Sequence, residues 1–312
     1  MKHDSPTLLL VGAGELGSRH LQGLASVAAQ KVLVVEPLSA ARERAIARFA
    51  EVATGSSPAL EFVDDIDGLD QRAAVGIIAT SSMLRREVVE RLVGRGVMPH
   101  QLVLEKFLFP AVADYAAVAA LVKNDTVVNT PRRRWALYRA LRGRLSTPFT
   151  LRVRGTGWGL CCNAVHFADI FAFLVGSAST FDFALEPGVA SAKRLGYVEI
   201  YGSIVGRAQD CTLELDCNLG ESVAIEIEVV VDGVGHRIDE RSGSCSGLGI
   251  VTSAPPFQSA DTGALVTSML AGLETALPTL AASTAIHLPL LAGFLNHYQR
   301  FVDAEALLCP VT

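Results

Sequence analysis

The first 128 residues alternate between short apolar runs and longer segments in which apolar residues recur at helical spacing. A strand that is buried on both faces has the form of such a run, because helices cover both sides of a parallel sheet. Strands that alternate with helices predict a doubly wound parallel sheet. The runs are Thr7–Val11, Lys31–Val35, Phe62–Val63, Ala73–Ala79, Leu102–Leu104 and Val127–Val128.

The pattern changes beyond Asn129, where apolar and polar residues alternate with a period of two. Such alternation indicates an antiparallel sheet with one face packed on helices. The expected strands are Thr150–Arg154, Tyr197–Tyr201, Thr212–Cys217 and Val223–Val231. The expected helices are Arg132–Leu141, Asn163–Val175, Gly263–Ala276 and Ser283–Phe301. The sequence therefore predicts an α/β chain with a parallel-sheet domain over residues 1–128 and an α+β domain, with an open, mainly antiparallel sheet, over residues 129–312.

Composition and charge narrow the class of protein. Half of the 312 residues are hydrophobic and 19% are charged, so a sizeable core is expected. A net charge of −5 argues against a nucleic-acid partner. No apolar run reaches membrane-spanning length, and the first residues lead directly into a strand, so we expect no membrane partner and a cytoplasmic location. The six cysteines lack CxxC pairing, which predicts reduced thiols and no metal site.

The sequence GAGELG, Gly12–Gly17, follows the first run and opens a helix. Gly12 permits a tight turn, Gly14 lets the backbone approach a pyrophosphate, and Gly17 lets helix and strand pack closely. The amides around Glu15 and Leu16, in the first helical turn, would face the phosphates. This context of strand, loop and helix is typical of the Rossmann dinucleotide-binding fold.

Glu36 ends the second run, about 20 residues after the glycines, where a ribose-binding acid is expected. A carboxylate there accepts hydrogen bonds from the ribose hydroxyls and repels a 2′-phosphate, which predicts NAD as cofactor without excluding NADP. Thr80 and Ser81 follow another buried run. They could cap the next helix and also contact the cofactor, because ligands bind at the carboxyl ends of parallel strands.

Two groups of residues are candidates for chemistry. Lys106 follows Glu105 just past a strand of the first domain, where a lysine of lowered pKa can face the nicotinamide; a surface lysine paired with Glu105 is the equal alternative. Asn163, His166 and Asp169 are spaced three apart, so they share one face of a helix and form a polar stripe on an apolar segment. We interpret the stripe as catalytic, although Asp169 could equally be structural.

Arg132 and Arg133 begin a predicted helix, where cations oppose the helix dipole. A phosphate or carboxylate of the substrate would explain them, since arginine binds such groups in bidentate fashion; the alternative is a solvated helix start. Trp135 could stack on a sugar ring or pack in the core. Weaker substrate candidates in the same domain are Arg194, Tyr197 and His287.

Together these motifs resemble the glucose–fructose oxidoreductase and inositol dehydrogenase family (Gfo/Idh/MocA). GAGELGSRHLQGL is similar to its dinucleotide loop, Glu105-Lys106 to the start of its Glu-Lys-Pro motif, and VHFADIFAFLVG to its His-x-x-Asp helix. The resemblance covers nearly the whole chain. It implies that Lys106 and His166 serve the reacting hydroxyl, with the histidine as base.

The chain departs from the family pattern at two positions. Phe107 stands where the family has a proline, often after a cis peptide, and a cis bond before phenylalanine is costly. Cys162 stands where many members carry an aspartate, and Asn163 is the candidate substitute.

The resemblance and the motifs predict an NAD-dependent oxidoreductase acting on a secondary alcohol or ketone carbon of a sugar or nucleotide sugar. The alternatives are a reductase of an imine or small keto compound and a non-catalytic NAD-binding sensor or scaffold. An open sheet face with apolar residues left outside must be covered, so we expect a homodimer or homotetramer through the second sheet, with Val223–Val231 contributing.

Overall fold

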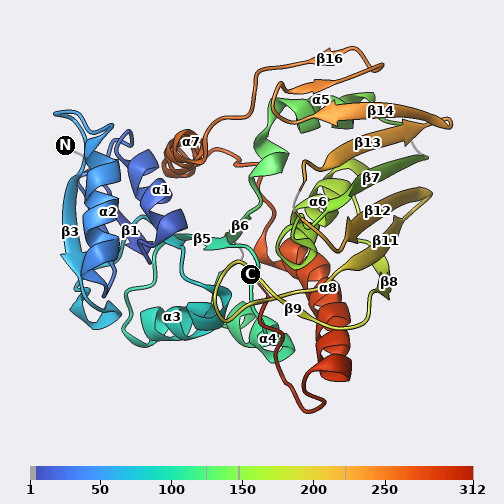
Figure 1. Cartoon of the computed structure of the whole chain (residues 1–312). Helices are drawn as coiled ribbons and strands as arrows, with labels where there is room; N and C mark the ends of the chain where they lie inside the picture. The colour runs from blue at the N-terminus through green and yellow to red at the C-terminus, as the bar shows by residue number, and fades with distance from the viewer. Residues whose placement is uncertain (1–4, 124, 147, 222, 312) are drawn as a thin grey trace. The chain divides into compact units, whose positions relative to one another are not determined.

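The computed structural model describes residues 5–123, 125–146, 148–221 and 223–311, and the chain folds into two compact units (Figure 1). Unit 1 comprises Met1–Leu108, Ala116–Asn129 and Pro256–Leu280. Unit 2 comprises Phe109–Tyr115, Thr130–Pro255 and Ala281–Thr312. Neither unit is a single stretch of chain, in contrast to the division at residues 128 and 129 that the sequence suggested.

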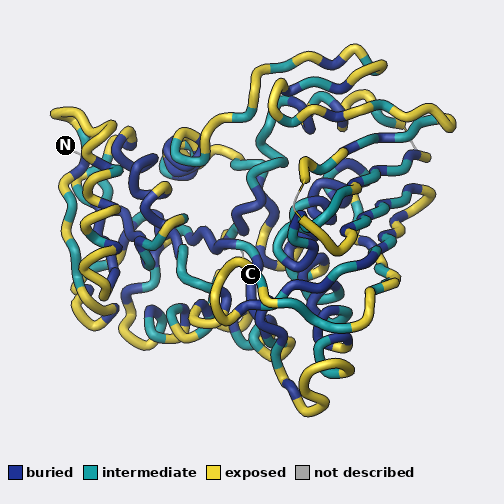
Figure 2. The backbone as a smooth tube through the Cα atoms, viewed as in Figure 1, coloured by how far each residue is buried: buried dark blue, intermediate teal, exposed yellow. Residues whose placement is uncertain are grey.

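Unit 1 contains a parallel six-stranded sheet in the order β3-β2-β1-β4-β5-β6. This is a doubly wound sheet, which is the class that the alternating pattern predicted. Its strands are β1 (Thr7–Val11), β2 (Lys31–Val35), β3 (Ala59–Val63), β4 (Val75–Ile78), β5 (Gln101–Glu105) and β6 (Val127–Asn129). The central strands are buried along almost their whole length (Figure 2), which explains their continuous apolar sequences.

Helices connect the strands of unit 1. They are α1 (Glu15–Leu24), α2 (Ser39–Ala50), the short 3-10 helix Ile66–Gly68, α3 (Ser82–Gly94) and α4 (Val112–Ala119), whose residues divide between the units.

Helix α7 (Gln258–Leu270) also belongs to unit 1, where it packs on α1. The two helices approach closely because glycines lie at their contact. A Cβ atom at Gly23 would lie 2.1 Å from the carbonyl oxygen of Ser259, and one at Gly263 would lie 2.5 Å from the Ser26 Oγ. The sequence predicted a helix over Gly263–Ala276 but placed it in the second domain. Periodicity shows that a helix has a buried face, not which core that face joins.

Unit 2 contains an eight-stranded sheet in the order β16-β15-β14-β13-β7-β12-β11-β8. All neighbours in it are antiparallel except β7 and β12. Its strands are β7 (Phe149–Thr156), β8 (Thr180–Leu185), β11 (Gly202–Ala208), β12 (Cys211–Asn218), β13 (Glu226–Val231), β14 (Val234–Asp239), β15 (Ser244–Cys245) and β16 (Ile250–Val251). The predicted α+β class with a mainly antiparallel sheet is confirmed.

The remaining elements of unit 2 are a 3-10 helix and three α-helices, with a small hairpin. They are the 3-10 helix Pro131–Arg134, α5 (Ala136–Arg144), α6 (Leu160–Val175), β9 (Ala190–Ser191), β10 (Val198–Glu199) and α8 (Leu280–Phe301), which begins at the last residue of unit 1. Helix α6 packs on β11 and β12, whose inward residues alternate with outward polar ones.

The outward positions of the central strands are charged and paired across the sheet. Arg152 Nε lies 2.7 Å from a carboxylate oxygen of Glu214, and its Nη1 lies 3.6 Å from one of Glu228. Arg154 Nε lies 3.3 Å from Asp216. These strands therefore do not present the apolar outer face on which the expectation of a sheet-mediated oligomer rested.

Candidate cofactor and substrate residues

The glycine loop joins β1 to α1 at the carboxyl edge of the first sheet. Gly12 has a φ of 87°, which favours glycine, and a Cβ at Gly17 would lie 1.9 Å from the Gly12 carbonyl oxygen. A Cβ at Gly14 would meet no atom within 4 Å. The first and third glycines are thus required by the fold, whereas the second leaves the loop open to a group approaching its backbone.

Glu36 and Thr80 border this loop. Glu36 follows β2 and is buried; its Oε2 accepts a hydrogen bond from the Ala13 N–H (2.7 Å) and its Oε1 one from the Leu38 N–H (3.1 Å). Thr80 follows β4, and its backbone nitrogen would lie 3.1 Å from a Cβ at Gly12. The Thr80 Oγ1 is buried and has no hydrogen-bond partner among the described residues. Next to it, Ser81 occupies the N-cap position of α3 without a capping side-chain hydrogen bond.

Glu15 and Leu16 lie in the first turn of α1, and Leu16 is half-buried. The exposed Glu15 carboxylate lies 2.8 Å from Arg48 Nη1, and the hydrogen bond from Arg48 lowers the pKa of Glu15 below its ordinary value. An acid at this position is favourable because the helix N-terminus is positive. Pairing with Arg48 gives Glu15 a structural role.

These features fit a bound dinucleotide. The open backbone at Gly14 and the N-terminus of α1 suit a pyrophosphate. The unpartnered Thr80 hydroxyl offers a hydrogen-bond donor, and the Glu36 carboxylate retains lone pairs that can accept from ribose hydroxyls.

Glu105, expected to contact the cofactor, lies in a buried polar network of unit 1. Its Oε1 is 2.8 Å from Nε2 of His20 on α1 and accepts a hydrogen bond of 2.5 Å from Asn129 Nδ2. The other His20 nitrogen lies 2.8 Å from the Thr262 Oγ1 of α7. Burial raises the pKa of Glu105, but the hydrogen bonds from His20 and Asn129 outweigh it and hold the pKa below its ordinary value. No motif in the sequence indicated a role for His20.

Lys106 follows β5 and is half-buried. Its peptide bond to Phe107 is cis, as in the Lys-Pro motif of the family that the sequence resembles, although phenylalanine replaces the proline. The buried Arg85 of α3 donates hydrogen bonds to the carbonyl oxygens of Phe107, Leu108 and Thr80. Because it binds the carbonyl groups of Phe107 and Leu108, this buried cation fixes the backbone that follows Lys106.

Asn163, His166 and Asp169 all lie on α6, as predicted, but in different surroundings. Asn163 Nδ2 donates to the carbonyl oxygens of Trp158 (2.8 Å) and Gly159 (3.2 Å), just before the helix. His166 is half-buried, whereas Asp169 is only 1% exposed. The stripe therefore runs from an accessible end of the helix into the interior of unit 2.

Asp169 forms a bidentate ion pair with Arg133. Arg133 Nε lies 2.7 Å from Oδ2 and its Nη2 lies 2.8 Å from Oδ1. Burial raises the pKa of Asp169, and the charge of Arg133 opposes that shift. Of the two roles open to Asp169, the structural one accounts for these contacts.

Arg132 is likewise paired within unit 2. Its Nε lies 2.6 Å from Glu240 Oε1, which also accepts a 2.6 Å hydrogen bond from the Tyr138 hydroxyl. Its guanidinium group lies over the rings of Trp135 (5.3 Å) and Phe167 (4.8 Å). Both arginines thus have carboxylate partners inside the unit, which removes the reason for expecting a substrate anion at them. The predicted helix over Arg132–Leu141 is interrupted at Trp135.

A carboxylate that no sequence motif indicated binds the first turn of α6. Glu199, from β10, accepts hydrogen bonds from the N–H groups of Cys161 (2.7 Å) and Ile200 (3.2 Å). Burial raises its pKa despite those two bonds. A Cβ at Gly159 would lie 3.3 Å from Glu199 Oε2 and 3.2 Å from Asn163 Nδ2. Glu199 therefore supplies a carboxylate near the first turn of α6, where the family pattern has its aspartate at the position of Cys162. The sequence placed Glu199 on the expected strand Tyr197–Tyr201, but no local pattern indicated that this strand would meet α6.

The remaining candidates are less informative. The Arg194 guanidinium lies 4.8 Å from the Tyr197 ring, and His287 is fully buried. All six cysteines are free thiols, and burial raises the pKa of Cys309 to about 12. Among the described residues there is no group of three metal-ligating side chains and no helix long and apolar enough for a bilayer.

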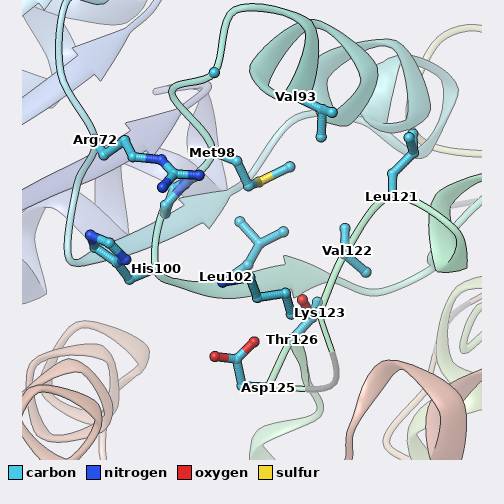
Figure 3. A pocket seen from close by; sticks show the side chains of 12 residues that line it. Arg72, Val93, Met98, His100, Leu102, Leu121, Val122, Lys123, Asp125 and Thr126 are labelled. Atoms are coloured by element: carbon cyan, nitrogen blue, oxygen red, sulfur yellow. The ribbon is translucent and has the colours of Figure 1, made fainter.

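A cavity of about 150 Å³ opens at the other edge of the first sheet, where β5 begins. Figure 3 shows the apolar side chains of Met98 and Leu102 in it, beside the charged side chains of Arg72 and Asp125. Ligands of parallel sheets bind at the carboxyl ends of the strands. This cavity is therefore separate from the candidate cofactor site.

No protein-family model matches the sequence, and no curated protein matches it. Solved structures match the fold over nearly the whole chain. The myo-inositol dehydrogenase of Lactobacillus casei, in complex with NAD(H) and myo-inositol, is 13% identical with a TM-score of 0.64, covering 99% of this chain and 98% of that one. The UDP-N-acetylglucosamine 3-dehydrogenase of Acidithiobacillus ferrooxidans is 14% identical with a TM-score of 0.63, covering 93% and 96%.

A reductase is also similar. The biliverdin reductase of Synechocystis, in complex with biliverdin and NADP+, is 14% identical with a TM-score of 0.62, covering 92% of this chain and 98% of that one. The chain thus has the fold of the inositol and sugar dehydrogenases and of this reductase, which is the fold that the resemblance to the Gfo/Idh/MocA oxidoreductases predicted.

Proposed function

We propose that the chain is an NAD-dependent oxidoreductase of the Gfo/Idh/MocA type that transfers hydride between the nicotinamide and a secondary alcohol or ketone carbon of a sugar or nucleotide sugar. The observation that carries the proposal is the glycine loop, open at Gly14 and bordered by the Glu36 carboxylate and the unpartnered Thr80 hydroxyl. NAD(H) and NADP+ occur in structures that share this fold. The substrate class rests on the inositol and sugar-nucleotide dehydrogenases among them.

The bound nicotinamide would supply the hydride acceptor for oxidation or the donor for reduction. In the oxidative direction His166 accepts the hydroxyl proton as the carbon loses hydride, and in the reductive direction it returns that proton. Lys106, when protonated, stabilises the negative charge that develops on the oxygen. Arg85 and the Glu105 network act on the backbone on either side of Lys106, and so hold this residue in place.

Glu36 favours NAD in this proposal, since a buried carboxylate beside the loop repels a 2′-phosphate. Reduced thiols agree with a cytoplasmic location. The charged outer face of the central strands removes the argument for a homodimer or homotetramer through the second sheet, and light scattering of the full chain measures the oligomeric state directly.

A reductase of a keto or imine compound is the second candidate, favoured by the biliverdin reductase with the same fold and by Cys162 in place of an acid. Titration with NADH and NADPH, followed by a turnover screen in both directions, separates the candidates.

The variants Lys106→Met and His166→Gln test the chemistry. Each should retain NADH binding and lose about 10²- to 10⁴-fold in kcat if the residue acts on the hydroxyl. Unchanged turnover in both would overturn the assigned roles. Binding of neither cofactor would overturn the oxidoreductase, and cofactor binding without turnover of any substrate would favour a sensor or scaffold.

A further inference from the structure

A second cavity, of about 270 Å³, lies within unit 2 at the carboxyl end of α6. Helices α5, α6 and α8 each contribute to it, together with Arg133. Its lining includes the two cations Arg133 and Arg142 and no acidic residue.

The two arginines differ in how far their charge is already neutralised. Arg133 uses Nε and Nη2 to bind Asp169, so its charge is already paired. Arg142 is exposed on α5 and has no carboxylate partner among the described residues. Its guanidinium group lies 4.5 Å from the centre of the Phe173 ring, and that of Arg133 lies 5.6 Å from the same ring. The cavity therefore carries an uncompensated positive charge, held beside an aromatic ring.

Ser177 adds a polar group that the fold does not satisfy. Its hydroxyl oxygen is buried and has no hydrogen-bond partner among the described residues, although the residue lines the cavity. A buried hydroxyl without a partner destabilises a fold, so such groups are uncommon and mark places where a missing ligand would bond. Ala282, in the first turn of α8, also lines the cavity, at the end of that helix where the dipole is positive.

We propose that this cavity binds a small organic anion through its phosphate or carboxylate group. The guanidinium group of Arg142 would bind the oxyanion by charge-assisted, bidentate hydrogen bonds, and the Ser177 hydroxyl would donate a further one. A volume of about 270 Å³ suits a compact metabolite rather than a dinucleotide.

The site is separate from the residues assigned to the proposed reaction and does not depend on that reaction. Gly176, which ends α6, is ten residues after His166, or about 15 Å along the helix axis. The cavity and His166 are nonetheless connected through Arg133 and Asp169. Arg133 lines the cavity and binds Asp169, which lies one helical turn from His166. An anion here would therefore act as an effector rather than as the reacting group.

The test is calorimetric titration of the full chain with inorganic phosphate and, separately, with succinate, at constant ionic strength. For whichever of the two anions the native chain binds, Arg142→Gln should raise the dissociation constant at least about tenfold. Arg144→Gln, two residues along the same helix and outside the cavity, is the matched control and should bind as the native chain does. Phosphate held at the glycine loop would be affected by neither variant.

Ser177→Ala gives an independent readout. It should weaken anion binding about threefold or more and leave the thermal midpoint of the free protein unchanged or higher, because it removes an unsatisfied hydroxyl. Binding of phosphate alone, or of succinate alone, would identify the anionic group. Equal binding of both anions by Arg142→Gln and Arg144→Gln, or no saturable binding by the native chain, would overturn the proposal.

Discussion

Nε2 of His20 lies 2.8 Å from the Glu105 carboxylate in the interior of unit 1, although 85 residues separate the two in sequence. Through this contact α1, which carries the glycine loop, is tied to β5, which ends one residue before Lys106. His20 also contacts Thr262 on α7. This buried pair therefore connects the helix that follows the glycine loop, the strand that precedes the candidate catalytic lysine, and α7.

Glu105→Gln should destabilise the fold by about 2 kcal/mol at pH 7, since it weakens hydrogen bonds to a buried charge. The folded-state pKa of Glu105 lies below the ordinary 4.5, so the carboxylate contributes stability above about pH 4.5 and loses it as the pH falls through the folded value. The difference in urea midpoint between native and variant chains should shrink on acidification. A difference that stays constant down to pH 3 would contradict this. Glu61→Gln, which removes an exposed pair with Lys31, should change stability little.

Gly14→Ala and Gly17→Ala form a matched pair at the loop. A methyl group at Gly14 meets no atom, so this variant should fold normally but bind NADH at least about tenfold more weakly, because the methyl group occupies the path of the pyrophosphate. At Gly17 the methyl group meets backbone at 1.9 Å, which should cost about 3 kcal/mol of stability. Thermal unfolding and fluorescence titration measure the two effects. Equal stability losses in both variants would refute the assignment.

Glu36→Gln should shift cofactor preference towards NADPH. The amide still accepts a hydrogen bond from the Ala13 N–H but no longer repels a 2′-phosphate. We expect the ratio of NADPH to NADH affinity to rise about tenfold. The measurement is the pair of dissociation constants, and an unchanged ratio would mean that other residues select the cofactor.

Arg133 and Asp169 should behave as a coupled structural pair. Each single replacement, Arg133→Met or Asp169→Leu, leaves a buried charge without its partner and should cost about 3 kcal/mol or more. The double variant should be more stable than the sum of the two losses predicts, because both charges are removed. Chemical denaturation of the native chain, the two single variants and the double variant gives the four free energies of unfolding for this double-mutant cycle. Additive losses would show that the pair contributes no coupling.

Glu199→Gln separates the charge of this residue from its role at the start of α6. The amide oxygen of glutamine can still accept a hydrogen bond from the Cys161 N–H. The variant Glu199→Ala loses this hydrogen bond and should lower the free energy of unfolding by about 1 kcal/mol. The folded-state pKa of Glu199 is raised by burial, so its ionisation lowers stability as the pH rises through that value. Glu199→Gln should therefore be at least as stable as the native chain at pH 8. A loss equal to that of the alanine variant would show that the charge itself is needed.

The parts of the fold that local sequence determines were predictable. The first strand, the glycine loop Gly12–Gly17 and the following helix are contiguous in sequence, and the alternation of strands and helices indicates a parallel, doubly wound sheet. The order of the six strands was not predicted, because alternation alone is compatible with more than one doubly wound order. The polar stripe on α6 was predictable from its spacing. Strands β8 and β11 were not recognised, and β10 is only two residues long where five were expected.

The partners of the polar side chains were not predictable, because they lie far along the chain. Arg132 meets Glu240 across 108 residues, and Arg133 meets Asp169 across 36. The arginines next to each other in sequence suggested an external anion, yet the fold supplies a carboxylate for each. Likewise, no local pattern relates Glu199 to the first turn of α6.

The return of α7 to unit 1 limits how this protein can be divided. Leu265, Val266 and Met269 belong to the same buried cluster as Leu21 and Leu24 of α1. A gene fragment ending at residue 129 would encode every strand of the six-stranded parallel sheet but would leave one side of α1 uncovered. This half of the molecule therefore cannot be exchanged as one continuous segment. A chimaera that exchanges it must inherit residues 256–280 as well, so its crossover points lie on both sides of the segment that encodes the second sheet.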